Sequence, residues 1–350
     1  MPEIHLNPAA RAAAHPGLFT REEYAQVSAF YDNHPTIRPT PLRRLPALAA
    51  ELGLDELLVK DETARGGLPA FKITGVAYAI DRLAATGRLR EDTVLTAATA
   101  GNHGRALARV ARDRGLRARI HVPADASRDR VEAIRGEGAE IVVSAGNYDQ
   151  AVREAAADAA ARGWLVVSDT AWPGYEEIPR WIKAGYTRVI DEALRDLSLS
   201  TKDPLPDLVL VQGGVGGLVA ATLSLLCARY GANRPTFATC EPIGSACLMA
   251  GARAGRPVLL DPLPGTMMEC LRCGEASSIA LPVISAASDA FVAVEDVWCE
   301  RAMRLLAAAG IPTGASGACG LAGLLALLEN GLKPRRALVI ATESDGAWVL

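Results

Sequence analysis

The sequence predicts an α/β protein of two lobes, each built on a mainly parallel, twisted sheet flanked by helices. Short runs rich in β-branched residues alternate with longer runs of helical periodicity, which is the pattern of parallel βα units. The chain has 350 residues, half of them hydrophobic, and this length favours two lobes over one. Glycine-rich segments follow two of the predicted strands and mark where chemistry should be sought.

The individual elements follow from local composition. Apolar side chains recur at helical spacing, with a glycine at the end, in residues 106–115, 129–138 and 148–163. The charged segment 191–207 is interpreted as a helix end followed by a connector, and it is a candidate domain border. The predicted strands are residues 56–60, 93–98, 118–124, 139–145, 164–169, 208–214, 236–242 and 337–342.

Charge and hydropathy exclude several classes of protein. The formal net charge is −3, so the chain has no general attraction to nucleic acid or to an anionic membrane. Residues 1–20 lack the uninterrupted apolar core of a signal peptide, and no apolar run reaches the roughly 20 residues that span a bilayer. A cytoplasmic protein is therefore expected, with no nucleic-acid or membrane partner.

The cysteines do not form a recognisable metal or disulfide framework. Their number is odd, and in a reducing compartment most should be buried as small hydrophobic side chains. Cys270 and Cys273 have the spacing of a zinc or redox pair, but no second pair or nearby histidine accompanies them, so no metal site is expected. The seven are Cys227, Cys240, Cys247, Cys270, Cys273, Cys299 and Cys319.

Lys72 is the first candidate functional residue, because lysine is scarce in a chain that otherwise uses arginine. It lies in the apolar stretch "GLPAFKITGVAYAI", and a lysine can lose its proton and attack a carbonyl, which a guanidinium cannot do. The alternative is a lysine whose stem covers apolar surface while its ammonium reaches water. The five lysines are Lys60, Lys72, Lys183, Lys202 and Lys333.

Two strand-to-helix junctions could bind anions. In "LVLVQGGVGGLVAATLSLL", residues 213–217 should direct backbone N–H groups and a helix N-terminus at one point, which suits a single phosphate; the alternative is a plain tight turn. The pattern fits neither GxGxxG nor a P-loop. In "TAATAGNHG", residues 99–104 could present donors to a carboxylate. His103 more plausibly caps or packs there than acts as a base.

The lysine in its "FK" stretch, the "TAGNHG" loop and the oligoglycine turn together resemble the fold type II pyridoxal phosphate enzymes, the group of the tryptophan synthase β-subunit, threonine dehydratase and serine racemase. Within this group the chain is most similar to diaminopropionate ammonia-lyase. The likeness extends from about Thr20 to "ATESDG" near the C-terminus, and "DTAWPGYEEIP" is specific to that subfamily.

This resemblance implies pyridoxal 5'-phosphate as cofactor and a role for each matching residue. Lys72 would form the Schiff base and then remove the substrate α-proton. Phe71 would pack beside the ring, Asn102 would bind its phenolic oxygen, and Thr342 would face its nitrogen. Backbone amides of the oligoglycine turn would hold the phosphate. The residues of this turn are Gly213, Gly214, Val215, Gly216 and Gly217.

The resemblance also implies how substrate is bound. Asp169 would bind a substrate β-ammonium or help to protonate a leaving group, although it could instead cap the following segment. Cys247 and Cys273 fall where the family has a pair that can form a disulfide, and reduced thiols are expected here. The loop that holds the substrate carboxylate would consist of Thr99, Ala100, Gly101 and His103.

Two positions depart from the family pattern. Ala100 replaces the aspartate that serves diaminopropionate ammonia-lyase as a second base for D-substrates, and Ala315 replaces an acidic residue before "SGA". The first departure predicts a preference for L-substrates. The substrate itself stays open among diaminopropionate, serine, threonine and other β-substituted amino acids.

The expected activity is β-elimination from a small L-amino acid, such as L-2,3-diaminopropionate, to give a pyruvate-type keto acid and ammonia. The larger lobe, residues 1–92 and 169–350, would bind the cofactor. A smaller mobile lobe, residues 93–168, would carry the carboxylate loop, and the family analogy implies a homodimer. The alternatives are a β-replacement synthase, or a non-catalytic relative that keeps the scaffold to bind a ligand.

Overall fold

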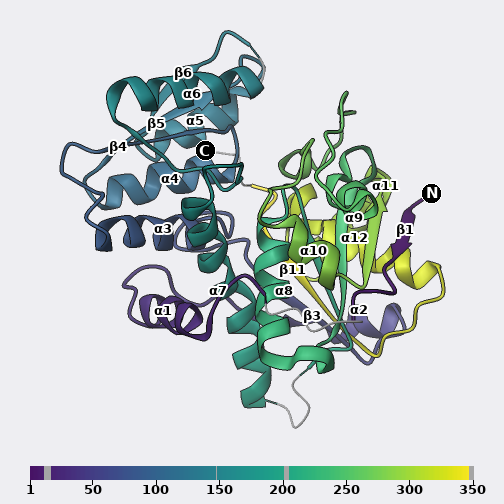
Figure 1. Cartoon of the computed structure of the whole chain (residues 1–350). Coiled ribbons are helices and arrows are strands. Elements are labelled where there is room, and N and C mark those ends of the chain that lie inside the picture. Colours follow the sequence, from purple (N-terminus) through teal and green to yellow (C-terminus); the bar gives the residue numbers. More distant parts are fainter. Residues whose placement is uncertain (12–16, 147, 201–204, 347–350) are drawn as a thin grey trace. The chain divides into compact units, whose positions relative to one another are not determined.

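A computed structural model of the chain describes residues 1–11, 17–146, 148–200 and 205–346 (Figure 1). The described residues form two compact units. The large unit consists of Met1–Phe71 and Tyr186–Gly346, and the small unit of Lys72–Gly185. Within these residues, no helix combines the length and the apolar character that crossing a membrane requires.

The large unit is built on a seven-stranded sheet whose five central strands are parallel. The two edge strands, β1 and β2, pair antiparallel to their neighbours. The central strands are almost wholly buried, which explains their continuous apolar runs. In sheet order the strands are β1 (Glu3–Leu6), β10 (Ala290–Val294), β9 (Thr236–Pro242), β8 (Leu208–Gln212), β11 (Arg336–Ala341), β3 (Glu56–Asp61) and β2 (Leu42–Arg44).

Helices flank this sheet (Figure 1). The helix α12 packs against β8, β9, β10 and β11, and it is buried from Ser316 to Leu327, so its apolar residues need no polar face. A Cβ on Gly323 would lie 2.3 Å from Cys240 Sγ, so glycine permits the close approach to the sheet. The helices are α1 (Arg21–Asp32), α2 (Pro46–Glu51), α8 (Gly217–Tyr230), α9 (Cys247–Ala254), α10 (Leu281–Ala287), α11 (Asp296–Ala308) and α12 (Ala315–Glu329), with 3₁₀ turns at Gly231–Asn233, Ile243–Ser245 and Glu269–Leu271.

The small unit contains a four-stranded, fully parallel sheet. The helix α4 packs against β4 and β5, α6 packs against β4, β5 and β7, and α3 packs against α4. In sheet order the strands are β6 (Glu140–Val143), β5 (Arg117–Val122), β4 (Val94–Ala98) and β7 (Leu165–Val166). The helices are α3 (Ile73–Ala85), α4 (Asn102–Asp113), α5 (Arg128–Gly136) and α6 (Tyr148–Arg162), and α7 (Glu177–Ser200) begins here and continues into the large unit.

The predicted α/β class, with two mainly parallel sheets, is confirmed, and each of the eight predicted runs overlaps a strand. The strands β1, β2 and β10 were missed. The first two are short, half-exposed edge strands with little apolar signal. The third, "AFVAV", is a buried five-residue run, a length at which periodicity separates strand from helix poorly.

The units divide at positions that differ from the expected lobe boundaries. The expected smaller lobe, residues 93–168, contains the whole four-stranded sheet. The small unit is larger because α3 packs against α4, and because a Cβ on Gly185 would lie 2.3 Å from the Thr74 carbonyl oxygen. The chain passes between the units within α7, at Gly185 and Tyr186, and not in the segment 191–207. Part of that segment, residues 201–204, lies outside the described residues.

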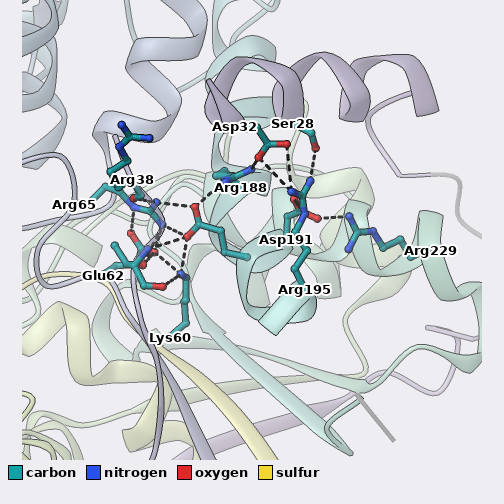
Figure 2. Close-up of polar contacts among 12 residues, drawn as sticks. Ser28, Asp32, Arg38, Lys60, Glu62, Arg65, Arg188, Asp191, Arg195 and Arg229 are labelled. Carbon is teal, nitrogen blue, oxygen red and sulfur yellow. Dashed lines mark hydrogen bonds and ion pairs between the residues drawn. The ribbon is translucent and has the colours of Figure 1, made fainter. Parts of the chain in front are cut away.

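A buried network of charges joins α7 to β3 and α1 within the large unit (Figure 2). Glu192 accepts hydrogen bonds from Lys60 Nζ at 2.7 Å and from two Arg65 nitrogens at 2.9 and 2.7 Å. Arg188 donates to Glu192 at 2.7 Å and to Asp32 at 2.7 Å. With Glu62 on Arg65, three buried cations meet two buried carboxylates, and the exposed Asp32 supplies a third carboxylate.

Candidate active site

Lys72 immediately precedes α3 in the small unit. Its side chain is about one-quarter exposed, and its Nζ donates to Asp169 Oδ2 at 2.6 Å. This contact favours a functional role for Lys72 over the interpretation as a surface lysine. Its ammonium is held by a carboxylate instead of extending freely into water.

Asp169 lies just after β7, in a tightly bonded loop. The Tyr175 hydroxyl accepts from the Ser168 amide at 2.9 Å and donates to the Val166 carbonyl at 2.9 Å. Trp172 stacks on Tyr175 with ring centroids 4.3 Å apart, so "DTAWPGY" folds back on itself. The next helix, α7, begins only at Glu177, so Asp169 is not its N-cap. The loop holds the carboxylate towards Lys72.

His103 completes this part of the site from the first turn of α4. Its buried Nε2 lies 2.7 Å from the Val167 carbonyl oxygen, which can only accept, so Nε2 carries the proton. Its Nδ1 lies 3.9 Å from Asp169 Oδ2. Burial lowers the pKa of His103, which Asp169 opposes and Lys72 reinforces. His103 is thus a buried imidazole whose Nε2 is committed to the main chain.

The loop before α4 has the form that anion binding requires. The Gly101 amide donates to Thr99 Oγ1 at 3.1 Å, and the Gly101 cap supplies no side-chain hydrogen bond to the helix N-terminus. A Cβ on Gly104 would lie 2.8 Å from Thr99 Cγ2, so glycine is required for the loop to close. Ala100 and Asn102 lie in the same turn, and Asn102 is buried. The loop thus offers backbone donors at a helix start.

Charge in this cluster is set by Asp169. Burial alone would raise the pKa of Asp169, but the Lys72 ammonium overcomes this effect, with smaller contributions from His103 and Lys183, and holds the pKa well below its usual range. Asp169 is therefore ionised at neutral pH. It is better suited to binding a cation than to donating a proton.

Lys183 belongs to the same cluster, and sequence reasoning missed it. It lies in the first part of α7, is fully buried, and donates from Nζ to the Asp169 carbonyl oxygen at 2.8 Å. Burial lowers its pKa to about 7, with Asp169 opposing and Lys72 adding to the effect. The scarcity of lysine in the chain was the signal that could have found it.

In the large unit, the oligoglycine turn joins β8 to α8 and leaves no room for side chains. A Cβ on Gly213 would lie 2.4 Å from Leu248 Cδ1, and one on Gly214 would lie 2.8 Å from Cys273 Sγ. Gly216 has a φ of +92°, which favours glycine, and as N-cap of α8 it makes no side-chain hydrogen bond. Free amides of the first turn and a bare backbone fit a phosphate group closely.

Thr342 and Phe71 lie beside each other near this turn. The strands β8 and β11 are parallel neighbours, so Thr342 and Gly213 follow strand ends at one edge of the sheet. The Phe71 amide donates to the Thr342 carbonyl at 3.3 Å, and the buried Phe71 ring packs edge-on against Tyr186. The large unit therefore brings together the residues that the resemblance assigns to the cofactor ring, Phe71 and Thr342, and the glycine turn that it assigns to the phosphate.

Gln212, at the end of β8, is a second residue that the sequence reasoning missed. Its Nε2 donates to Thr342 Oγ1 at 3.1 Å and to the Gly317 and Ile340 carbonyls at 2.8 and 2.9 Å. Because Thr342 accepts this bond, its own hydroxyl proton can be donated to a further acceptor, such as an unprotonated ring nitrogen. A polar residue closing the apolar run "LVLVQ" was the available signal.

The remaining predicted positions lie in the large unit. The Gly214 carbonyl accepts from Cys247 Sγ at 3.5 Å, and Cys273 Sγ would lie 2.8 Å from a Cβ on Gly214. Ala315 opens α12, and the neighbouring Ser316 Oγ accepts from the Cys270 amide at 3.1 Å. Among the described residues, no group of three or more His, Cys, Asp and Glu side chains could hold a metal ion.

The comparisons with known proteins agree with this site. The chain belongs to the family described as "Pyridoxal-phosphate dependent enzyme", whose profile matches residues 34–343. Pyridoxal 5'-phosphate is thus its cofactor, and the residues described above fit that group. The chain is thus a fold type II enzyme that depends on this cofactor.

Within this family the chain is similar to diaminopropionate ammonia-lyase. It is 36% identical to the Salmonella typhimurium enzyme over 332 residues, which is 87% of this chain and 82% of that enzyme. The Escherichia coli enzyme with its aminoacrylate-PLP azomethine intermediate has a TM-score of 0.88 at 33% identity, covering 99% of this chain and 94% of that one. The same enzyme with D-serine has a TM-score of 0.89 at 31% identity and the same coverage. The resemblance seen in the sequence is confirmed.

Proposed function

We propose that this enzyme catalyses β-elimination from a small L-amino acid, with L-2,3-diaminopropionate as the leading substrate. In the balanced reaction, 2,3-diaminopropionate and water become pyruvate and two molecules of ammonia. The observation that carries the proposal is the 2.6 Å contact between Lys72 Nζ and Asp169 Oδ2. It pairs an amine able to move a proton with a carboxylate able to bind a cationic leaving group.

Each residue has a separate task in this proposal. The cofactor, when bound, withdraws electrons and acidifies the Cα–H bond of the substrate. Lys72 holds the cofactor covalently and then takes that proton. The ionised Asp169 binds the β-ammonium, which leaves as ammonia without needing a proton from another acid. The residues proposed to grip the substrate carboxylate are Thr99, Ala100, Gly101 and His103.

The large unit supplies the remaining contacts of the proposal. The turn of residues 213–217 holds the phosphate with its backbone amides, apart from that of Gly213, which already donates to the Cys240 carbonyl at 2.9 Å. Phe71 packs beside the ring. Thr342 would donate a hydrogen bond from its hydroxyl to the ring nitrogen, which would leave that nitrogen unprotonated and limit electron withdrawal to what elimination requires. Asn102, of the small unit, binds the phenolic oxygen. The proposal also includes a homodimer, by analogy with the family that the sequence resembles, and a cytoplasmic location.

The proposal is tested by keto-acid release from a panel of L- and D-β-substituted amino acids. Borohydride reduction followed by peptide mapping should place the reduced adduct on Lys72, and Lys72→Arg should yield no adduct at this position. An adduct on another amine would overturn the proposed chemistry. Protein that stays colourless after incubation with pyridoxal phosphate would instead support a non-catalytic, ligand-binding relative.

A β-replacement synthase is the second candidate. The replacement of two acidic family positions by Ala100 and Ala315 favours it, because a less charged site is compatible with an incoming nucleophile. The same substrate panel, repeated with added thiol and amine nucleophiles, separates the candidates. A new β-substituted amino acid in place of pyruvate would identify the synthase.

A further inference from the structure

Lys183 is a buried charge that the proposed chemistry leaves unused. Its side chain is fully buried, although transferring an ammonium out of water is costly unless it is paired and hydrogen-bonded. Its Nζ donates to the main-chain carbonyl of Asp169 at 2.8 Å. This contact places a second amine, besides Lys72, around the residue proposed to receive the β-substituent.

The groups that face Lys183 define its electrostatic surroundings. Asp169 follows β7, Lys72 precedes α3, and His103 lies in the first turn of α4. Asp169 favours the charged form of Lys183, whereas burial and the Lys72 ammonium disfavour it and lower the pKa of Lys183 to about 7. His103 feels the Lys183 charge in turn, and its own pKa is lowered mainly by burial. Asp169 thus contacts both amines, Lys72 through a carboxylate oxygen and Lys183 through its main-chain carbonyl.

We propose that Lys183 is a specificity-determining residue, whose positive charge beside Asp169 disfavours cationic β-substituents and favours uncharged ones. The inference rests on the proposed function, in that Asp169 receives the β-substituent of the substrate. Lys183 acts through Asp169 and does not itself touch the substrate, because it is fully buried. It is a positioning residue that also sets local charge.

The mechanism is electrostatic. A protonated Lys183, held at the main-chain carbonyl of Asp169, repels a β-ammonium that approaches the Asp169 carboxylate. A neutral Lys183 removes this repulsion. Linkage then requires that binding of a cationic β-substituent releases a proton from Lys183 and strengthens as pH rises through the pKa of that lysine. A hydroxyl or another uncharged β-substituent should show no such dependence.

The test compares L-2,3-diaminopropionate with L-serine, which share a skeleton and differ at Cβ. The holoenzyme, Lys183→Met and Lys183→Arg are assayed from pH 6 to pH 8. Dividing wild-type kcat/KM by that of Lys183→Met at each pH cancels the substrate's own titration. For diaminopropionate this ratio should rise about tenfold over the range, as the neutral fraction of a group with a pKa near 7 rises. For serine it should stay constant.

The two variants fix Lys183 in opposite states. Lys183→Met is always neutral and should prefer diaminopropionate at every pH, whereas Lys183→Arg is always charged and should disfavour it throughout. If Lys183 had a purely structural role, its substitution would lower the melting temperature of the protein and would change kcat equally for the two substrates. Equal pH profiles for the two substrates in wild type and Lys183→Met would overturn the inference. The exposed Lys333→Met is the matched control and should behave as wild type.

A second measurement does not depend on turnover. The chain has five lysines, so selective ¹³C-lysine labelling gives few resonances, and Lys183→Met identifies the one from Lys183. That resonance should titrate near pH 7; titration near pH 10 would refute the inference. If neither amino acid is turned over, the proposed function fails. The preference is then still tested by measuring how tightly each amino acid binds to the holoprotein, with cofactor absorbance as the signal. Equal pH dependence of the two affinities would count against Lys183.

Discussion

Lys72 Nζ and Asp169 Oδ2 lie 2.6 Å apart, although 97 positions separate the two residues in the chain. The small unit brings them together by packing the start of α3 near the loop that follows β7. The low pKa of Asp169 keeps this carboxylate ionised, and it offers the same oxygen to any cation that replaces the ammonium. The predictions below begin from this contact.

Asp169→Asn should act selectively on substrates with a cationic β-substituent. A hydrogen bond to a charged group contributes about 1.5–3 kcal/mol, so kcat/KM for L-2,3-diaminopropionate should fall about ten- to hundredfold. L-serine, whose hydroxyl carries no charge, should lose less. Steady-state kinetics with both substrates checks this, and an equal loss for the two would show that Asp169 acts only by holding Lys72.

Ala100 should restrict the enzyme to L-substrates. No carboxylate is present at this position to take a proton from the opposite face of a D-substrate, so D-2,3-diaminopropionate should be turned over poorly. Ala100→Asp should raise the activity on the D-enantiomer, whereas the isosteric, uncharged Ala100→Asn should not. Enantiomer-resolved assays of keto-acid release provide the measurement. Comparable turnover of the two enantiomers by the wild type would contradict the prediction.

Gly216→Ala should weaken binding of the cofactor. A Cβ here would lie 2.6 Å from Ile284 Cδ1, at a φ of +92° that already disfavours alanine, and the displaced turn would lose its phosphate contacts. The matched control is Gly255→Ala, which has a φ of +66° but no atom within 4 Å of the new Cβ. Both variants should lose about 1 kcal/mol of stability from backbone strain.

Titration with pyridoxal phosphate separates the two glycine variants. The affinity of Gly216→Ala should fall at least tenfold, while that of Gly255→Ala should stay within about twofold of wild type. Unchanged affinity in Gly216→Ala would show that the turn does not hold the phosphate. Thermal melting of both apoproteins reports the cost of the strain itself.

Glu192→Gln should destabilise the large unit. Removing one partner of a buried charge network leaves the cations uncompensated and costs about 3–5 kcal/mol. Chemical denaturation measures the loss. The exposed Glu300, which pairs with Arg304 on α11, supplies the control: Glu300→Gln should cost less than about 0.5 kcal/mol. If both variants lost the same free energy of unfolding, the network would have no stabilising role.

The pH dependence of the free energy of unfolding should reveal the titration of Glu192. Burial raises the pKa of Glu192, but Arg65 and then Lys60 outweigh this effect and lower the pKa from 4.5 to about 2. The stabilisation is therefore complete above pH 4.5 and is lost as the pH falls towards 2. Glu192→Gln should remove this part of the acid unfolding profile, so the stability difference from wild type should shrink with acidification. A constant difference would exclude the linkage.

The sequence by itself determined the fold class and pointed to the family. Parallel βα units are encoded in local periodicity, so the eight predicted runs each overlap a strand. The oligoglycine turn and the loop before α4 could be recognised because close backbone approach demands glycine at particular positions, and Lys72 stood out because its chemistry is one that arginine cannot supply.

Only the tertiary structure decided which charges meet. Nothing in the spacing of Lys72, Asp169 and Lys183 shows that both amines contact Asp169, because this depends on how α3, α7 and the loop after β7 pack within the small unit. The same is true of Gln212 beneath Thr342 and of the buried network on Glu192. A side chain's charge is written in the sequence, but its desolvation and its partners arise from packing between distant segments.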